Sequence, residues 1–151
     1  MHIAITTRTC TLFSCLCCAV TLTINAYDAV QLYHLGLSVL TESQSDVASS
    51  VNLTDACLLA VVGIKSSSPY GGILAETSSG VVTDASWKCS GDIQIGWNLA
   101  SFDDAAWAQA QVVAPNDGSN FAFFAEISPQ AEWIWAQDSS GIYAFCRKRL
   151  C

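Results

Sequence analysis

Short apolar runs separated by Ser, Gly, Asp and Asn recur along the chain, and this pattern predicts β-strands. The runs span residues 20–24, 30–39, 57–64, 71–75, 81–82, 111–114, 121–127 and 142–150. No helical periodicity is sustained beyond about two turns, and no segment repeats another. About eight or nine short strands at this spacing are typical of an antiparallel β-sandwich or barrel.

The run at 57–64 differs from the others because it has no polar side chains interleaved with its apolar ones. A strand of this kind is expected to be buried on both faces. The polar stretches 41–50 and 66–68 are predicted to be loops within one domain. The one good helical candidate is a short corner near residues 103–110, where Asp103 caps the first turn and alanines supply helix propensity.

The N-terminal segment has the pattern of a secretory signal peptide. Arg8 precedes an uncharged run at 9–27, and small residues allow cleavage after Ala19, with Ala26 as a second candidate. The alternative is an uncleaved membrane anchor, because the run approaches the ~20 residues that cross a bilayer.

Cysteine usage agrees with secretion. Four of the eight cysteines lie before Ala19, which leaves an even set for two disulfides: Cys57, Cys89, Cys146 and Cys151. The sequence does not choose among their three pairings. A zinc site would need closely spaced cysteine pairs, and this set contains no two matching pairs. Asn52-Leu53-Thr54 is an N-glycosylation sequon.

The net charge of the chain bears on which classes of partner it can bind. The 151-residue chain is 52% hydrophobic and 13% charged, as expected of a globular protein, and its formal net charge is −7. That charge argues against a nucleic-acid partner, whose phosphates it would repel. Half of the six basic residues lie in the cluster 147–149, which we predict to be the solvated rim of a last strand.

The sequence offers no convincing catalytic machinery. Only His34 remains after removal of the signal, and no nucleophile elbow of the G-x-S-x-G type is present. Asp103 and Asp104 are adjacent, so at a helix start they point roughly 100° apart. A glycosidase pair must instead face each other across ~5 to 9 Å. We therefore predict that the protein is not an enzyme.

Acidic residues near predicted strand ends raise the question of calcium, which takes oxygen ligands from several segments. These residues are Asp28, Asp55, Asp84, Asp92, Asp117 and Asp138. None forms a D-x-D-x-D loop, so each is predicted to be a turn or capping residue. Calcium stays an alternative cofactor whose ligands the sequence does not assign.

The aromatic residues carry the strongest signal for binding. All five tryptophans lie in the second half of the chain. A tryptophan face is a good platform for the apolar side of a sugar ring, with polar neighbours to fix the hydroxyls. Trp97 and Trp133 lie next to turn residues and are candidates for this role, whereas Trp107 and Trp135 are expected in the core.

Several short motifs occur in one order along the chain. They are 26–36 (AYDAVQLYHLG), 59–61 (LAV), 71–74 (GGIL), 87–90 (WKCS), 96–97 (GW), 102–107 (FDDAAW), 133–135 (WIW) and 143–148. Together they resemble galactose-binding-like jelly-roll domains, such as the sugar-binding modules of bacterial α-L-rhamnosidases and related domains of secreted animal proteins. The resemblance covers about residues 20–150.

This resemblance implies a single jelly-roll β-sandwich with Trp107 packing a structural corner. It also implies that cleavage after Ala19 preserves the first strand, so we expect a signal at 1–19 and a domain at 20–151. Loops at one end of the sandwich would bind ligand. The expected contacts are Asp28, Trp97, Trp133 and Asp138.

Two functions follow as expectations. The first is a secreted, lectin-like module that binds extracellular glycans or glycoproteins without catalysis, aided by homo-oligomers because one shallow site is weak. The second is an extracellular structural or adhesion protein that uses the same sandwich for protein contacts. Leu35 favours the second function, because it stands where the family has a turn asparagine.

Overall fold

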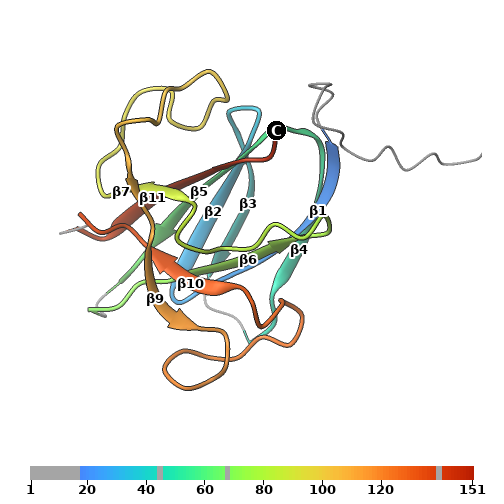
Figure 1. Ribbon diagram of the computed structural model, residues 1–151, viewed down its shortest axis with the longest axis vertical. Coiled ribbons are helices and arrows are strands. Elements are labelled where there is room, and N and C mark those ends of the chain that lie inside the picture. The colour runs from blue at the N-terminus through green and yellow to red at the C-terminus, as the bar shows by residue number, and fades with distance from the viewer. Residues whose placement is uncertain (1–17, 44–45, 67–68, 139–140) are drawn as a thin grey trace, which may run out of the picture.

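The computed structural model describes residues 18–43, 46–66, 69–138 and 141–151, and within them the chain forms two antiparallel sheets packed as a sandwich (Figure 1). The five-stranded sheet has the order β4-β1-β6-β10-β9, and the six-stranded sheet has the order β3-β2-β5-β11-β7-β8. The strands are β1 (Cys18–Ala26), β2 (Ala29–His34), β3 (Leu37–Ser43), β4 (Ser49–Ala56), β5 (Leu58–Ile64), β6 (Ile73–Thr77), β7 (Lys88–Ser90), β8 (Ala108–Gln109), β9 (Gln111–Pro115), β10 (Glu132–Trp135) and β11 (Tyr143–Arg149). The predicted all-β, two-sheet antiparallel architecture is confirmed.

Strand β5 illustrates how the apolar pattern builds this sandwich. Leu59 and Val61 belong to the core between the two sheets, while Leu58, Ala60 and Val62 pack in a separate cluster on the outer face. Successive side chains of a strand point to opposite faces, so a strand that is apolar at every position must be covered twice. The expectation of a strand buried on both faces is confirmed.

A long loop at 116–131 covers the outer face of the five-stranded sheet. It packs Phe121, Phe124 and Ile127 against Trp133 of β10. The prediction of a strand in this run is wrong, because its buried residues recur every third position while the residues between them are exposed. That spacing places the apolar side chains on one side of an irregular loop, not on alternate faces of a strand.

A second long loop, 91–107, covers the outer face of the six-stranded sheet. Trp97 packs edge-on against Phe145 of β11 with ring centroids 5.1 Å apart, and Trp107 packs against Phe102 at 5.5 Å. These aromatic side chains cover the outward-facing apolar residues of β5 and form one cluster with them. Each sheet therefore carries a layer of loop on its outer side.

The expected helical corner at 103–110 is not helical, and this prediction is corrected. Asp103 Oδ1 accepts a hydrogen bond from the backbone N–H of Ala105 at 3.0 Å, and Trp107 N–H donates to Asp104 C=O at 3.0 Å, which closes a single turn. Residues 108–109 then extend as β8 and pair with β7. The tertiary pairing overrides the helix propensity of the alanines.

A buried arginine fixes this corner to the sandwich. Arg147 of β11 is 1% exposed, and its guanidinium donates to Asp104 Oδ2 at 2.7 Å, Leu99 C=O at 2.9 Å and Phe102 C=O at 3.3 Å. Burial lowers the pKa of the Arg147 guanidinium, and the Asp104 carboxylate opposes that shift. The prediction of a solvated rim is therefore wrong for Arg147, whereas Arg149 is exposed as predicted.

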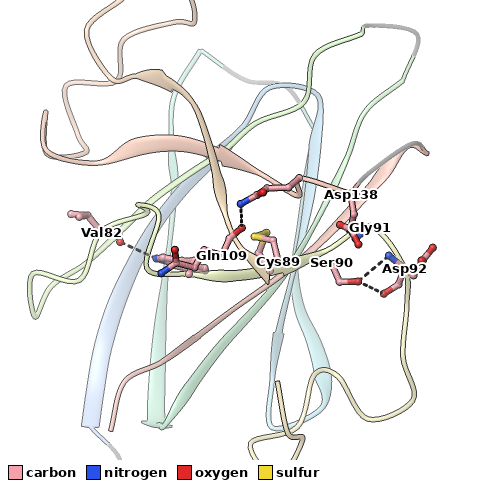
Figure 2. The surroundings of a disulfide bond; sticks show 10 residues. Val82, Cys89, Ser90, Gly91, Asp92, Gln109 and Asp138 are labelled. Atoms are coloured by element: carbon pink, nitrogen blue, oxygen red, sulfur yellow. Dashed lines mark hydrogen bonds between the residues drawn. A yellow bond between two sulfur atoms is a disulfide. The ribbon is translucent and has the colours of Figure 1, made fainter. Parts of the chain in front are cut away.

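Cys89 and Cys146 form a disulfide between paired positions of β7 and β11 (Figure 2). Cys57 is also disulfide-bonded, whereas Cys151 is free and exposed beyond the end of β11. The predicted set of four cysteines therefore does not form two bridges among its own members. The expectation of disulfides is confirmed, and the inclusion of Cys151 in the bonded set is corrected.

Strand β1 begins within the predicted signal segment. Cys18 pairs with Ala56 of β4, so the two residues before the expected cleavage point belong to the sheet. Residues 1–17, on which the signal-peptide prediction depends, lie outside the described residues. Within the described ranges, no helix has the length and hydrophobicity needed to span a membrane.

Candidate functional site

Three loops that connect strands meet at one end of the sandwich: the β1–β2 turn, the β5–β6 loop and the β10–β11 loop. Tyr27 N–H, just after β1, donates to Gly72 C=O at 2.9 Å, which joins the β1–β2 turn to the β5–β6 loop. Lys65 N–H, just after β5, donates to Ile142 C=O at 2.8 Å, which joins that loop to the β10–β11 loop. The site described below is built at this end.

A groove of about 700 Å³ opens among these connections. This volume lies within the range of ~300 to 1,000 Å³ that is typical of small-molecule sites. Four aromatic side chains line it: Tyr27, Tyr70, Phe121 and Trp135. They come from four separate segments of the chain, so only the fold brings them together.

Close packing against glycine sets the floor of the groove. The Trp135 ring lies directly against the backbone of Gly71, where a Cβ atom would stand 2.7 Å from the indole. Any side chain at this position would push the ring away. Tyr70, the residue before it, is 61% exposed and stands edge-on to Phe121 with centroids 6.5 Å apart. An exposed ring thus stands beside a buried one.

Uncharged amides provide most of the hydrogen-bonding capacity of the groove. Gln111, Asn120 and Gln137 are in its lining. Gln137 Nε2 donates to Gln109 C=O at 2.9 Å, whereas the side chains of Gln111 and Asn120 bond to no other described residue. Each of these two amides offers two donors and one acceptor to a ligand.

Lys65 supplies the one cationic side chain among the described lining residues. Its ammonium contacts Pro69 C=O at 3.4 Å and forms no ion pair with any described carboxylate.

The loop that carries Asn120 and Phe121 into the groove is held by one buried amide. Asn116 is 1% exposed, and its Nδ2 donates to Phe124 C=O and Ile127 C=O, both at 3.1 Å, and to Ser128 C=O at 3.3 Å. Its Oδ1 accepts from Phe124 N–H at 3.0 Å. These bonds replace the strand pairing that the irregular loop lacks.

The two predicted aspartates lie at this end of the molecule but hold loops in place. Asp28 Oδ2 accepts from Ser66 N–H at 2.8 Å, and this bond ties the β1–β2 turn to the β5–β6 loop. Asp138 Oδ1 accepts from Gly91 N–H at 2.8 Å, close to the disulfide (Figure 2). Neither is in the groove lining, although each is next in sequence to a residue that is.

The two predicted tryptophans lie in opposite outer layers. Trp97 packs with Tyr33 and Phe145 outside the six-stranded sheet, and Trp133 packs with Phe121 and Phe124 outside the five-stranded sheet. Both are buried. The structure therefore does not bring Asp28, Trp97, Trp133 and Asp138 together as one site.

Other predicted groups lie away from the groove. Asn52 is exposed on β4, at the edge of the five-stranded sheet, and its Oδ1 accepts from Thr21 Oγ1 at 2.7 Å. Asp117 lies in an exposed turn, where hydrogen bonds from Ser119 lower the pKa of its carboxyl. Within the described part of the chain, no three His, Cys, Asp or Glu residues are grouped to hold a metal ion.

Sequence reasoning missed Tyr70, Gln111 and Asn120. The Pro69-Tyr70-Gly71 stretch carries a usable signal, because a tyrosine between turn residues is exposed more often than one inside an apolar run. No local signal marks the two amides.

No protein-family model, no curated protein and no solved structure matches this sequence. The two-sheet antiparallel sandwich is compatible with a jelly-roll-like fold.

Proposed function

We propose that this protein is a secreted, non-catalytic carbohydrate-binding module of the galactose-binding-like jelly-roll type, which holds glycans in the groove at the end of its sandwich. The observation that carries the proposal is the combination of exposed and buried aromatic rings with unpaired amides in one groove. Sugars present apolar C–H faces and many hydroxyls, and these two kinds of side chain complement them. The Cys89–Cys146 disulfide supports an oxidising compartment.

Each part of the groove has a role in this proposal. Tyr70 stacks against the face of a sugar ring, Trp135 forms the floor, and Gln111 and Asn120 bond to hydroxyls. Asp28 and Asp138 act as positioning residues, because their carboxylates hold the loops that frame the groove. An open site of this kind binds one glycan weakly, so several copies are needed for useful avidity.

A glycan array tests the proposal. The full chain is produced through a secretory pathway, clustered on a multivalent support, and applied with calcium and then with EDTA. We expect binding to a restricted set of glycans, and EDTA sensitivity would indicate an ion in the site. Silence in both conditions, from protein shown to be folded by near-UV circular dichroism, would refute the proposal.

Two exposed residues provide matched variants. Tyr70→Ser removes the exposed groove ring, and Leu37→Ser changes another exposed apolar residue at the start of β3, which is not in the groove lining. Leu37→Ser should alter the free energy of unfolding by no more than about 0.5 kcal/mol, and Tyr70→Ser, which also loses the ring contact with Phe121, by about 1 kcal/mol. Binding should fall by about tenfold for Tyr70→Ser and stay constant for Leu37→Ser.

A second candidate function, protein contact, is favoured by a separate surface. Leu35 and Leu37 are each 71% exposed, and Leu99 lies against Gly36 between them. Asn98 Nδ2 donates to Gly36 C=O at 3.3 Å, which joins the β2–β3 turn to the loop 91–107. Exposed apolar side chains that gather in this way are typical of contact sites.

Leu35→Asn tests this second function without an expected loss of stability. Leu35 has φ of 51°, a left-handed conformation that asparagine adopts more readily, so the variant should be at least as stable as the natural chain. If the surface joins two copies of the chain, sedimentation velocity will show a dimer that the variant loses. A monomeric natural chain at high concentration would refute self-association through this surface.

A further inference from the structure

We infer that the site takes an oligosaccharide of at least two sugar units, with a second subsite in a smaller hollow that shares Tyr27 with the groove. This inference rests on the proposed carbohydrate-binding function and specifies its ligand. The hollow has a volume of about 230 Å³ and is lined by Tyr27, Asp46, Phe123 and Trp133, among others. That volume is below the usual range for a whole ligand, so it suits one terminal unit.

Tyr27 is common to both cavities. It is in the lining of the groove and of the hollow, and its ring packs at a tilt against Phe121 with centroids 4.8 Å apart. The segment 120–124 runs from one cavity to the other, because Asn120 and Phe121 line the groove while 122–124 line the hollow. A glycan chain that crosses Tyr27 would contact both cavities along this segment.

The same feature recurs in both cavities. Trp135 lines the groove and Trp133 lines the hollow. An indole ring offers an apolar surface to the C–H face of a sugar. A chain of linked sugars would meet one indole in each cavity, whereas a monosaccharide would meet only one of the two.

The polarity of the two cavities also differs. Lys65 is in the lining of the groove and Asp46 is in the lining of the hollow, so the two cavities carry opposite charges. A ligand confined to one cavity would meet only one of these charges. A ligand that spans both cavities would meet both.

The test compares glycans of increasing length. Soluble mono-, di- and tetrasaccharides of the galacto-, cello-, malto-, manno- and chito- series, together with α-L-rhamnose, compete with array binding by the full chain. For the series that binds, the disaccharide should compete about tenfold better than the monosaccharide.

Two variants locate the second subsite. Phe123→Ser removes a ring that is 53% exposed, and Ala122→Gln fills the hollow without removing a contact. Each should reduce disaccharide binding to the level of the monosaccharide and leave monosaccharide binding unchanged. Tyr70→Ser should reduce both, and Leu37→Ser neither.

Two outcomes would overturn the inference in different ways. Glycan binding that is equal for one, two and four units, and unaffected in both hollow variants, would leave the carbohydrate-binding proposal standing with a single subsite. No competition by any of these sugars, together with a silent array, would remove the carbohydrate-binding proposal and this inference with it.

Discussion

Replacing Asn116 with Ala is the most informative single change in this molecule. The substitution removes three hydrogen bonds that Nδ2 donates to carbonyls of the loop and one that Oδ1 accepts. A buried hydrogen bond contributes about 1 kcal/mol net, and a buried N–H left without a partner costs a further ~1 to 3 kcal/mol. Because Nδ2 shares two protons among three acceptors, we expect a loss of about 2 to 4 kcal/mol in the free energy of unfolding.

A loss of this size should leave the sandwich folded, since a domain of this kind is stable by about 5 to 15 kcal/mol. The effect should instead concentrate in the loop 116–131, which would open more often. Hydrogen exchange at the Phe124 amide should accelerate, while exchange in β5 should change much less. Glycan binding should weaken as well, because this loop carries Asn120 and Phe121 into the groove.

Urea denaturation, amide exchange and array binding together check this prediction. Asn116→Asp is the sharper companion, because it keeps the shape but turns an acceptor oxygen toward three carbonyls, so its loss should exceed that of Asn116→Ala. Asn98→Ala is the matched control, since its side chain donates one bond at 3.3 Å and should lose less than about 1 kcal/mol. Equal stability losses for Asn116→Ala and Asn98→Ala would refute the reasoning.

The remaining predictions concern stability, glycosylation and disulfide pairing. Asp104→Ala leaves its buried arginine partner without a carboxylate and should cost about 2 to 3 kcal/mol in urea denaturation. Asp103→Ala, which removes one turn cap, should cost about 1 kcal/mol, and equal losses would contradict the ion-pair argument. The secreted chain should lose mass on treatment with an N-glycanase, and Asn52→Gln should abolish that shift; a natural chain without the shift would be evidence against glycosylation. Cys57 is disulfide-bonded and Cys151 is free. Non-reducing peptide mapping of the full chain should therefore find Cys57 in a bridge and Cys151 as a free thiol, and a Cys57–Cys151 bridge would contradict this arrangement.

The sandwich architecture could be predicted from the sequence more fully than the individual strands, because a buried strand leaves a run of apolar residues in the sequence. The unbroken apolar run of β5 can be satisfied only by cover on both faces, and the structure supplies that cover. Strand β4 leaves a weaker pattern, because it is an edge strand with most of its side chains exposed. The polar stretch 41–50 therefore predicts a loop, and this range overlaps the first two residues of β4.

The functional end of the molecule was harder to predict, because its residues come from separate segments. The position of the groove between Tyr70 and Gln111 depends on which loops meet, and sheet topology decides that. Two buried polar residues were also missed. Asn116 has the composition of an ordinary turn, and Arg147 sits in a basic cluster that resembles a solvated strand end, so neither carries a local sign of burial.

Each outer layer of the sandwich is tied down by one buried polar side chain, Asn116 for the loop 116–131 and Arg147 for the loop 91–107. These anchors bond mainly to backbone carbonyls, which every amino acid possesses. The exposed residues between Asn116 and Phe124 are thus open to substitution without loss of the anchor. The fold therefore has two outer surfaces that can be exchanged on a constant sandwich, and a library that varies the exposed positions 119, 120, 122 and 123 while keeping the buried Phe121 should yield new ligand specificities from folded proteins.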